Sequence, residues 1–302
     1  VLKSDIDTYA TALGLDFRST QLAQFPPEGL TLDFATVKLE ATLDVETIVG
    51  LAKKVHQITL LTAPNAWAQF FTNLPLLTAY ALDKHNTGGV LTDVISVSYG
   101  TCEHNWNNHG AAGAIEALEL VFQTAAAAGV TVVFASGDQG SSDCASDTHP
   151  TPWLPNYENV DYPGSSPWVT AVGGTNLLLH PDNSIAEAEV WNDWPLALDF
   201  AFPSDYANPC QTPPCRPAPW LAGGGGASIR FDAPPWQQNT GSTKRMTPDI
   251  AYMADLYPAT LLHLEGKWEG VGNGTSQAAP TFAAAVLLLN EFRKKTTNQR
   301  SA

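Results

Sequence analysis

The stretch that decides the fold is residues 131–140, which reads Thr131-Val132-Val133-Phe134-Ala135-Ser136-Gly137-Asp138-Gln139-Gly140. Its first half is a continuous apolar run, which is typical of a strand buried on both faces of a sheet. Its second half is small and polar. In open α/β sheets, functional residues gather at the carboxyl ends of the strands. The stretch therefore predicts a parallel strand that ends in a functional loop.

Helical and strand patterns alternate on both sides of this stretch. The predicted helices cover residues 34–54, about 65–85, 109–128 and 276–293, and the other predicted strands cover 58–61, 94–98 and 168–172. Residues 181–245 are rich in Pro, Gly, Trp and Asp, and we expect long surface loops there. Strands separated by helices form parallel units with both sheet faces covered. We expect an α/β fold, a mainly parallel central sheet flanked by helices, in a single domain over residues 1–302.

The chain is acidic and sparsely charged. It has 15 Lys+Arg against 30 Asp+Glu, a formal net charge of −15, and only 15% charged residues. It therefore lacks the basic face that a nucleic-acid partner requires. No apolar run approaches the roughly 18–20 residues of a membrane span, so we expect no membrane partner either. The first residues show neither an initiator Met nor a signal peptide, which suggests a processed or trimmed product.

The composition also bears on behaviour in acid. Once carboxylates are protonated, only 15 Lys+Arg and 7 His remain to repel one another, so self-repulsion at low pH should be weak. A generic acidic secreted surface explains the same composition equally well.

Four cysteines are present, at positions 102, 144, 210 and 215. Cys210 and Cys215 bracket a proline-rich loop, which suits a local disulfide. Cys102 and Cys144 each follow a predicted strand end and could pair across one edge of the sheet. A four-cysteine zinc site needs two pairs of closely spaced cysteines, and only Cys210 and Cys215 are close in the sequence. We predict two disulfides and an oxidising compartment rather than free thiols.

A second motif precedes the last predicted helix and reads Gly272-Asn273-Gly274-Thr275-Ser276-Gln277-Ala278-Ala279-Pro280. Its glycine-rich turn delivers Ser276 to the first turn of an Ala-rich helix, where free N–H groups and the helix dipole can hold an oxyanion. An isolated Gly-Thr-Ser would be only a helix N-cap. The longer string resembles the nucleophile motif shared by subtilisin-like serine peptidases and the sedolisins, or serine-carboxyl peptidases.

These two families differ in the residues that assist the nucleophilic serine. A subtilisin relative needs a His in a His-Gly-Thr-His-type helix, and none of the seven His lies in such a context. The helix expected there carries Glu40 and Asp44 instead, four residues apart and hence on one face. Together in a cleft they would share a proton, whereas alone they would be ordinary surface acids. Glu40, Leu43 and Asp44 match the sedolisin pattern Glu-x-x-Leu-Asp.

Asp138 supplies the third match, because residues 136–140 resemble the Ser-Gly-Asp-x-Gly string of sedolisins. An Asp donates to an oxyanion only when it is protonated, which suits an enzyme that works in acid. Taken alone, the residue would indicate an Asx-turn. Smaller matches lie at 162–175, 223–228, 235–237 and 248–251, so that the resemblance covers about residues 33–292.

The resemblance implies a set of site residues. The catalytic residues would be Ser276, Glu40, Asp44 and Asp138, and the substrate-binding residues would be Ser98, Tyr99, Gly100, Ser136, Gly137 and Asp161. Full sedolisins also begin with a strand before the position of Val1 and end with a calcium site. Only 26 residues follow Ser276, and Glu291 is the sole acid among them. We therefore expect Ca²⁺ only in full-length family members, no metal ligands in these 302 residues, and a prosegment in the precursor.

The resemblance implies a subtilisin-like three-layer α/β fold. The implied function is an acid-acting serine-carboxyl endopeptidase, with Ser276 as nucleophile, Glu40 and Asp44 as the base pair and Asp138 as oxyanion donor. We expect polypeptide substrates, a monomer, and a secreted location or an acidic lysosome-like compartment. Two alternatives remain at this point, namely a neutral Ser-His-Asp peptidase and an inactive peptide-binding homologue. The sequence does not separate endopeptidase from tripeptidyl-peptidase action.

Overall fold

The computed structural model describes residues 1–25, 38–63, 67–83, 91–108, 111–142, 158–192, 221–255, 259–271 and 274–296. The helices in these ranges are α1 (Lys3–Ala12), α2 (Lys38–Leu51), α3 (Trp67–Leu82), α4 (Glu103–Asn108), α5 (Ala112–Ala127) and α6 (Thr275–Thr296), with short 3₁₀ turns η1 (Ser19–Gln21) and η4 (Pro235–Thr240). The strands are β1 (Leu22–Phe25), β2 (Ile58–Leu61), β3 (Val94–Val97), β4 (Thr101–Cys102), β5 (Thr131–Ala135), β6 (Asp161–Tyr162), β7 (Thr170–Leu179), β8 (Ile185–Val190), β9 (Gly226–Asp232), β10 (Lys244–Thr247), β11 (Ile250–Met253), β12 (Thr260–Leu264) and β13 (Lys267–Val271).

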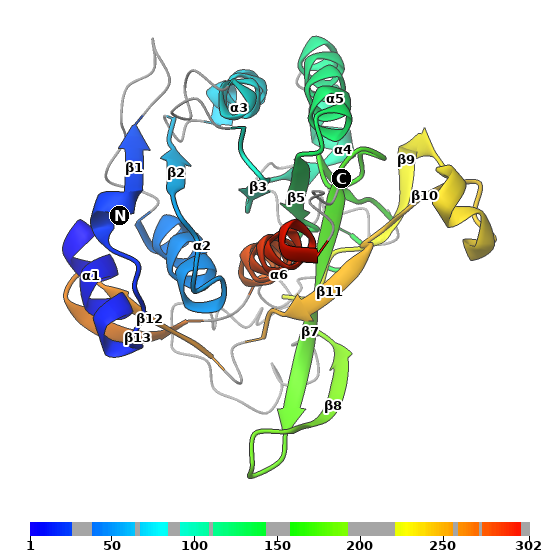
Figure 1. The fold of residues 1–302 in the computed structure, drawn as a ribbon. Coiled ribbons are helices and arrows are strands. Elements are labelled where there is room, and N and C mark those ends of the chain that lie inside the picture. The colour runs from blue at the N-terminus through cyan, green and yellow to red at the C-terminus, as the bar shows by residue number, and fades with distance from the viewer. Residues whose placement is uncertain are drawn as a thin grey trace, which may run out of the picture.

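The central sheet has the strand order β11-β7-β5-β3, and all of these neighbours pair in parallel (Figure 1). Strand β8 adds to the outer half of β7 in the antiparallel direction. Strands β1 and β2 form a separate parallel pair, and β12 with β13 forms an antiparallel hairpin. This arrangement confirms the predicted α/β fold with a mainly parallel central sheet.

Strand β5 shows how the sheet is covered on both faces. Successive side chains of a strand point to opposite faces. Val133 and Ala135 pack against the small residues of α6, while Val132 and Phe134 join the cluster of α5. Helix α6 also lies beside α2, and α3 lies beside α5 (Figure 1). The continuous apolar run is therefore explained by burial between two helical layers.

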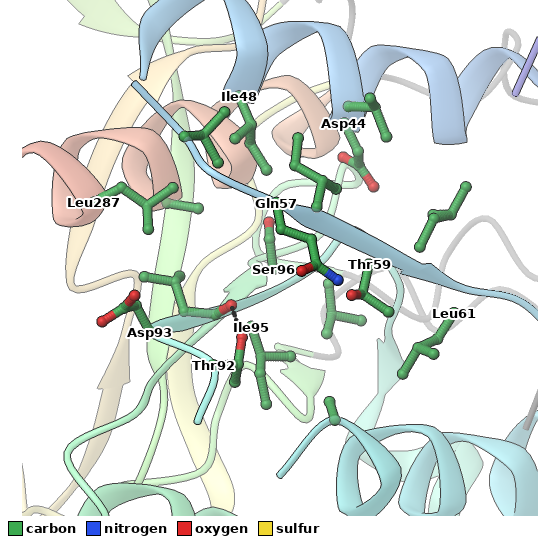
Figure 2. A pocket seen from close by; sticks show the side chains of 18 of the residues that line it. Asp44, Ile48, Gln57, Thr59, Leu61, Thr92, Asp93, Ile95, Ser96 and Leu287 are labelled. Carbon is green, nitrogen blue, oxygen red and sulfur yellow. Dashed lines mark hydrogen bonds between the residues drawn. The ribbon is translucent and has the colours of Figure 1, made fainter. Parts of the chain in front are cut away.

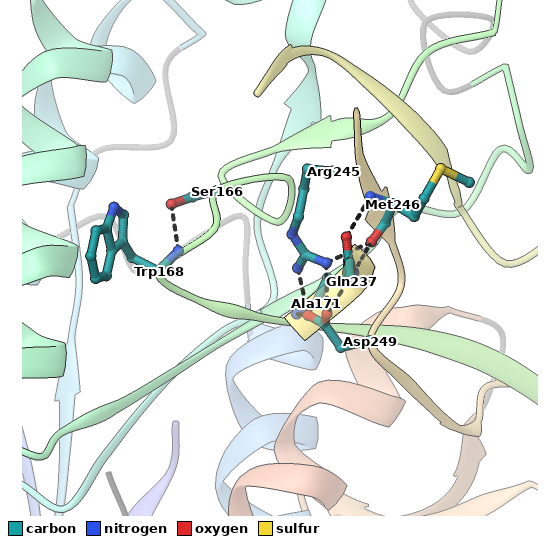
Figure 3. A network of polar contacts seen from close by, with 7 residues as sticks. All are labelled: Ser166, Trp168, Ala171, Gln237, Arg245, Met246 and Asp249. Carbon is teal, nitrogen blue, oxygen red and sulfur yellow. Dashed lines mark hydrogen bonds and ion pairs between the residues drawn. The ribbon is translucent and has the colours of Figure 1, made fainter. Parts of the chain in front are cut away.

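A buried ion pair attaches the β10–β11 segment to β7. The fully buried Arg245 contacts both carboxylate oxygens of Asp249, and Asp249 also accepts the backbone N–H of Ala171 at 2.9 Å (Figure 3). Gln237 of η4 closes the network by exchanging hydrogen bonds with the backbone of Met246. Both carboxylate oxygens of Asp249 thus have partners, as burial requires, whereas Nε of Arg245 is buried without one.

The predicted elements agree with the structure where the local pattern is strong. Strands β2 and β5 have the predicted bounds, and the strand predicted at 168–172 is the start of the longer β7. The expectation of loops throughout 181–245 was wrong for β8, β9, η4 and β10. Strand β8 is exposed along its whole length, so its residues do not show the apolar pattern of a buried strand. Its structure depends on pairing with β7.

One of the four cysteines, Cys102, lies within the described residues. Cys102 is disulfide-bonded in the structure, and the other three cysteines lie outside the described residues. The pairing scheme therefore stays a prediction. Within the described ranges, no helix is both long and apolar enough to cross a bilayer.

Candidate active site

Helix α6 begins at the carboxyl end of β5, where Thr275 joins the two segments. The hydroxyl and the backbone N–H of Thr275 both donate to Oδ1 of Asp138, at 2.8 and 2.7 Å. The same hydroxyl lies 3.2 Å from the backbone of Gly137. The start of α6 is therefore bound to the loop after β5, and Ser276 follows directly on this fixed point.

Glu40 approaches Ser276 from α2, which packs along α6. The hydroxyl of Ser276 is hydrogen-bonded to the Glu40 carboxylate. Burial raises the pKa of Glu40, the bond to Ser276 lowers it and a negative charge on Asp138 raises it, so that the pKa is about 7. Oε1 of Glu40 is buried and has no hydrogen-bond partner. Glu40 is thus a carboxylate with a spare acceptor oxygen beside a helix-borne hydroxyl.

Asp44 lies one helical turn further along α2 and contacts Ser98 at the end of β3. Its Oδ1 is 2.8 Å from the Ser98 hydroxyl, which is also 3.2 Å from the carbonyl oxygen of Ser276. Burial raises the pKa of Asp44 well above its usual range, and the neighbouring Glu40 charge raises it further. The hydrogen bond of Asp44 is with Ser98, and its interaction with Glu40 is electrostatic.

The carbonyl of Ser276 needs this contact because of Pro280. In an α-helix the carbonyl of residue 276 accepts the N–H of residue 280, and proline has none. The Ser98 hydroxyl takes the place of that donor. The single hydrogen of the Ser98 hydroxyl lies within reach of both Oδ1 of Asp44 and the Ser276 carbonyl, so Ser98 links α2 to α6. Burial favours the protonated form of Asp44, and the hydrogen bond from Ser98 acts in the opposite direction.

Asp138 presents its second oxygen to the space beside Gly274. Burial raises the pKa of Asp138, and its bonds from Thr275 lower it. A Cβ atom at Gly274 would lie 3.1 Å from Oδ2 of Asp138 and 3.7 Å from the backbone nitrogen of Ser276. The position that a side chain would fill thus lies next to two groups that can donate to an oxyanion. Glycine keeps this position open.

The predicted substrate-binding residues lie in different environments. Tyr99 is exposed, and Gly100 lies against Asp161, whose Oδ2 would be 3.0 Å from a Cβ at position 100. Ser98 contacts Asp44 and the Ser276 carbonyl, as described above. The Ser136 hydroxyl is buried and donates to the carbonyl of Gly224 at 2.7 Å, so its side chain does not face a substrate. Gly137 contacts Thr275 through its backbone.

Two residues of the site were missed by reasoning from sequence. The sequence motif contains Thr275 but gives no sign that its hydroxyl donates to Asp138. Gly224 lies under the Asp138 loop, where a Cβ would come within 2.3 Å of the Ser136 carbonyl oxygen. Its position in the run of four glycines at 223–226 was the available signal.

The described residues include no group of three or more His, Cys, Asp or Glu side chains arranged to hold a metal ion. These residues do not fit a calcium site, and calcium therefore stays an expectation about full-length relatives.

Comparison with known proteins places this geometry in a family. Residues 81–301 match the model of the Subtilase family. The chain is 32% identical to kumamolisin from Bacillus sp. (strain MN-32) over 261 residues, which is 83% of this chain and 39% of kumamolisin. It is 31% identical to sedolisin from Pseudomonas sp. (strain 101) over 281 residues, which is 92% of this chain and 43% of sedolisin.

A solved structure of Pseudomonas sedolisin, a serine-carboxyl proteinase complexed with two molecules of pseudo-iodotyrostatin, superposes with a TM-score of 0.75. It is 26% identical, and the match covers 97% of this chain and 72% of that one. The chain spans about two fifths of the length of these curated relatives.

Proposed function

This chain belongs to the Subtilase family, in its sedolisin or serine-carboxyl peptidase branch, and we propose that it hydrolyses peptide bonds with Ser276 as nucleophile. The observation that carries the proposal is the hydrogen bond from the Ser276 hydroxyl to Glu40, at the start of a helix and beside Asp138. A nucleophile in contact with a base, with oxyanion donors adjacent, is the arrangement that acyl transfer needs.

In the first step, Oγ of Ser276 attacks the scissile carbonyl carbon and its proton passes to Glu40. Collapse of the tetrahedral intermediate breaks the C–N bond, and Glu40 returns the proton to the leaving amine. Water then attacks the acyl-enzyme, Glu40 takes the proton of the water, and Ser276 regains its hydrogen as the acid product leaves. Glu40 thus acts alternately as base and acid, while Asp44 and Ser98 position the start of α6.

The oxyanion would be held by protonated Asp138 and the backbone N–H of Ser276. One such donor contributes roughly 3–4 kcal/mol of transition-state stabilisation in related chemistry. Ionised Asp138 would repel the oxyanion instead, so activity is lost as pH rises through the folded pKa of Asp138. A protonated Asp138 also removes the charge that raises the pKa of Glu40, so that Glu40 ionises more readily in the state that catalysis needs. We propose acid-side activity on this basis.

The finer features of the protein follow from its relatives and its composition. We propose endopeptidase action on polypeptides, a monomer, two disulfides, and a secreted or lysosome-like acidic location. For the full-length protein we propose a prosegment and bound calcium, and for residues 1–302 a single catalytic domain. His263, a buried histidine on β12, lies 3.1 Å from Asp5 of α1, whereas the Ser276 hydroxyl is bonded to Glu40. This observation supports Glu40 rather than a His as the base.

The test is turnover of an acid-denatured protein by the wild type, by Ser276→Ala and by Ser4→Ala, a matched change on the exposed face of α1. We expect Ser276→Ala to lose activity by a factor of about 10⁴ or more while its circular dichroism is unchanged. A peptide aldehyde should form a covalent adduct with the wild type at Ser276 only. Full activity in Ser276→Ala, or a maximum at pH 8, would overturn the proposal.

A further inference from the structure

The predicted substrate-binding residues 98–100 form one continuous segment, the substrate wall. A groove of about 840 Å³ lies between β2 and β3 (Figure 2) and borders the first two residues of this wall. On the groove side, the Ser98 hydroxyl holds the wall to Asp44. The other end of the wall continues into β4 and then reaches Glu103, the first residue of α4. The position of this end therefore depends on how Glu103 is held.

Glu103 is fully buried, and its carboxylate accepts hydrogen bonds from two different segments. Its Oε1 accepts the hydroxyls of Ser165 and Ser228, both at 2.6 Å. Its Oε2 accepts the backbone N–H of Ile229 at 2.8 Å. Ser165 lies in the loop after β6, whereas Ser228 and Ile229 belong to β9. Hydrogen bonds to a carboxylate are short and directional, and they offset the cost of burying it.

Both of these segments lead to the proposed site. The backbone N–H of Ser165 donates to the carbonyl of Asp161 at 2.9 Å, and Oδ2 of Asp161 lies against Gly100 of the substrate wall. Strand β9 begins two residues after Gly224, whose N–H donates to the carbonyl of Gly137 at 2.7 Å. Gly137 belongs to the loop after β5 that carries the proposed oxyanion donor. Glu103 thus joins the substrate wall to the oxyanion loop.

We propose that Glu103 is a positioning residue for substrate binding, which holds the substrate wall at the distance from the oxyanion loop that an extended peptide requires. This role rests on the function proposed above, because it takes residues 98–100 as the place where the peptide lies. The partners of Glu103 are structural groups rather than reacting atoms. Its loss should therefore weaken binding of the peptide and leave the chemical step at Ser276 nearly unchanged.

The hydrogen bonds of Ser228 make Glu103→Gln a specific test. The hydroxyl oxygen of Ser228 already accepts the N–H groups of Arg230 and Phe231, at 3.0 and 2.8 Å, so its hydrogen is what remains for the carboxylate. The backbone N–H of Ile229 can also only donate. Glutamine has the size of glutamate but offers one acceptor oxygen in place of two. In either orientation of its amide, one bond to β9 is replaced by two donors that face each other.

Glu119→Gln is the matched control. Glu119 on α5 holds the same loop through the next serine, since it accepts the hydroxyls of Ser166 and Tyr162 at 3.1 and 3.0 Å. A general loosening of this loop would therefore appear in both variants. Of the two, only Glu103→Gln breaks a hydrogen bond to the β9 strand that leads to the oxyanion loop.

Binding is measured by surface plasmon resonance on the Ser276→Ala protein, which cannot cleave its ligand. The probe is acid-denatured haemoglobin, because an unfolded protein offers extended segments of many compositions. Glu103→Gln should raise the dissociation constant about tenfold, as expected for one hydrogen bond to a carboxylate, and Glu119→Gln should change it by less than about twofold. In proteins that retain Ser276, Glu103→Gln should raise KM about tenfold and leave kcat within about a factor of two.

Ser165→Ala is the second variant, and it decides the question if circular dichroism shows that Glu103→Gln does not fold. It removes one hydroxyl and leaves the carboxylate bonded to β9, so the dissociation constant should rise about threefold. The proposal is overturned by an equal rise in both glutamine variants, by a fall in kcat with unchanged KM, by no change in Ser165→Ala, or by absence of probe binding to the Ser276→Ala protein. Lack of turnover by the wild type would contradict the proposed function alone, because the dissociation constants are measured without turnover.

Discussion

At Asp138 the two oxygens of one carboxyl group have different environments. Oδ1 accepts two hydrogen bonds from Thr275, and Oδ2 lies beside the open position at Gly274. The first oxygen holds the side chain in place, and the second is free to carry a proton toward a substrate. Single residues of this site thus combine a structural and a chemical task.

Asp138→Asn tests the need for a protonated acid. The amide keeps an oxygen for Thr275 and donates at every pH, so the loss of kcat/KM at high pH should move to higher pH than in the wild type. Asp138→Ala, which has no donor, should lose about 10²–10³-fold in kcat at all pH values. Full pH–rate profiles of the three proteins are the measurement. Identical high-pH limbs in wild type and Asp138→Asn would contradict the assignment.

Gly274→Ala tests the open position between the two donors. A methyl group there would occupy space 3.1 Å from Asp138 Oδ2, and we expect kcat to fall about 100-fold. Gly241→Ala is the control, because Gly241 has φ of +76° and no atom within 4 Å of its Cβ position. The control should lose about 1 kcal/mol of stability through backbone strain and keep its kcat. Equal kcat in both variants would refute the interpretation.

At the scale of elements, three segments meet at the first turn of α6. Helix α2 brings the two carboxyl groups, the loop after β5 brings Asp138, and the end of β3 brings Ser98. Pro280 makes the last contact necessary, because it leaves the Ser276 carbonyl without its helical donor. The helix that presents the nucleophile is therefore completed by a residue from a strand.

Ser98→Ala tests this contact. Loss of the hydroxyl leaves the Ser276 carbonyl and Asp44 without their shared partner, so we expect a tenfold fall in kcat, little change in KM and a stability loss of about 1–2 kcal/mol. Ser96→Ala, two residues earlier on β3, removes a buried hydroxyl without a partner and should lower neither stability nor kcat. In a Pro280→Ala background the carbonyl regains a helical N–H, and the stability loss from Ser98→Ala should shrink. Additive losses would disprove the coupling.

At the scale of the whole molecule, buried acids link stability to pH. Glu46 on α2 is fully buried and accepts the backbone N–H of His263 at 2.7 Å, while Asp5 on α1 accepts the N–H groups of Glu265 and Gly266. Burial raises the pKa of Glu46 from 4.5 to about 8. The folded protein thus holds a proton that the unfolded chain releases near pH 4.5. Stability from this group is complete below pH 4.5 and is lost as pH rises toward 8.

Glu46→Gln should remove this dependence. The amide keeps an acceptor for His263 and cannot ionise, so the variant should gain about 1–3 kcal/mol over the wild type at pH 8 and differ little from it at pH 4. Urea unfolding at both pH values provides the comparison, with Glu187→Gln on the exposed β8 as control. A larger gain at pH 4 than at pH 8 would reverse the sign and refute the argument.

The acidic, lysine-poor composition acquires a physical meaning from these buried acids. Burial raises the pKa of each of Glu40, Asp44, Glu46 and Asp138. A fold that keeps several acids protonated is favoured by low pH, and the few Lys and Arg limit repulsion there. Stability and the protonated oxyanion donor Asp138 are thus both favoured by low pH, whereas Glu40 must be ionised to act as the proposed base.

The sequence by itself determined the buried strand β5 and the helices around it, and it singled out Ser276, Glu40, Asp44 and Asp138 as the candidate site. These features are local, because apolar runs and short motifs depend on neighbouring residues alone. Only the tertiary structure decided that Ser98 replaces the donor missing at Pro280, that Thr275 holds Asp138, and that β2 and β3 border a groove. These contacts join residues up to 178 positions apart, and no local pattern encodes which distant backbone group will be left without a partner.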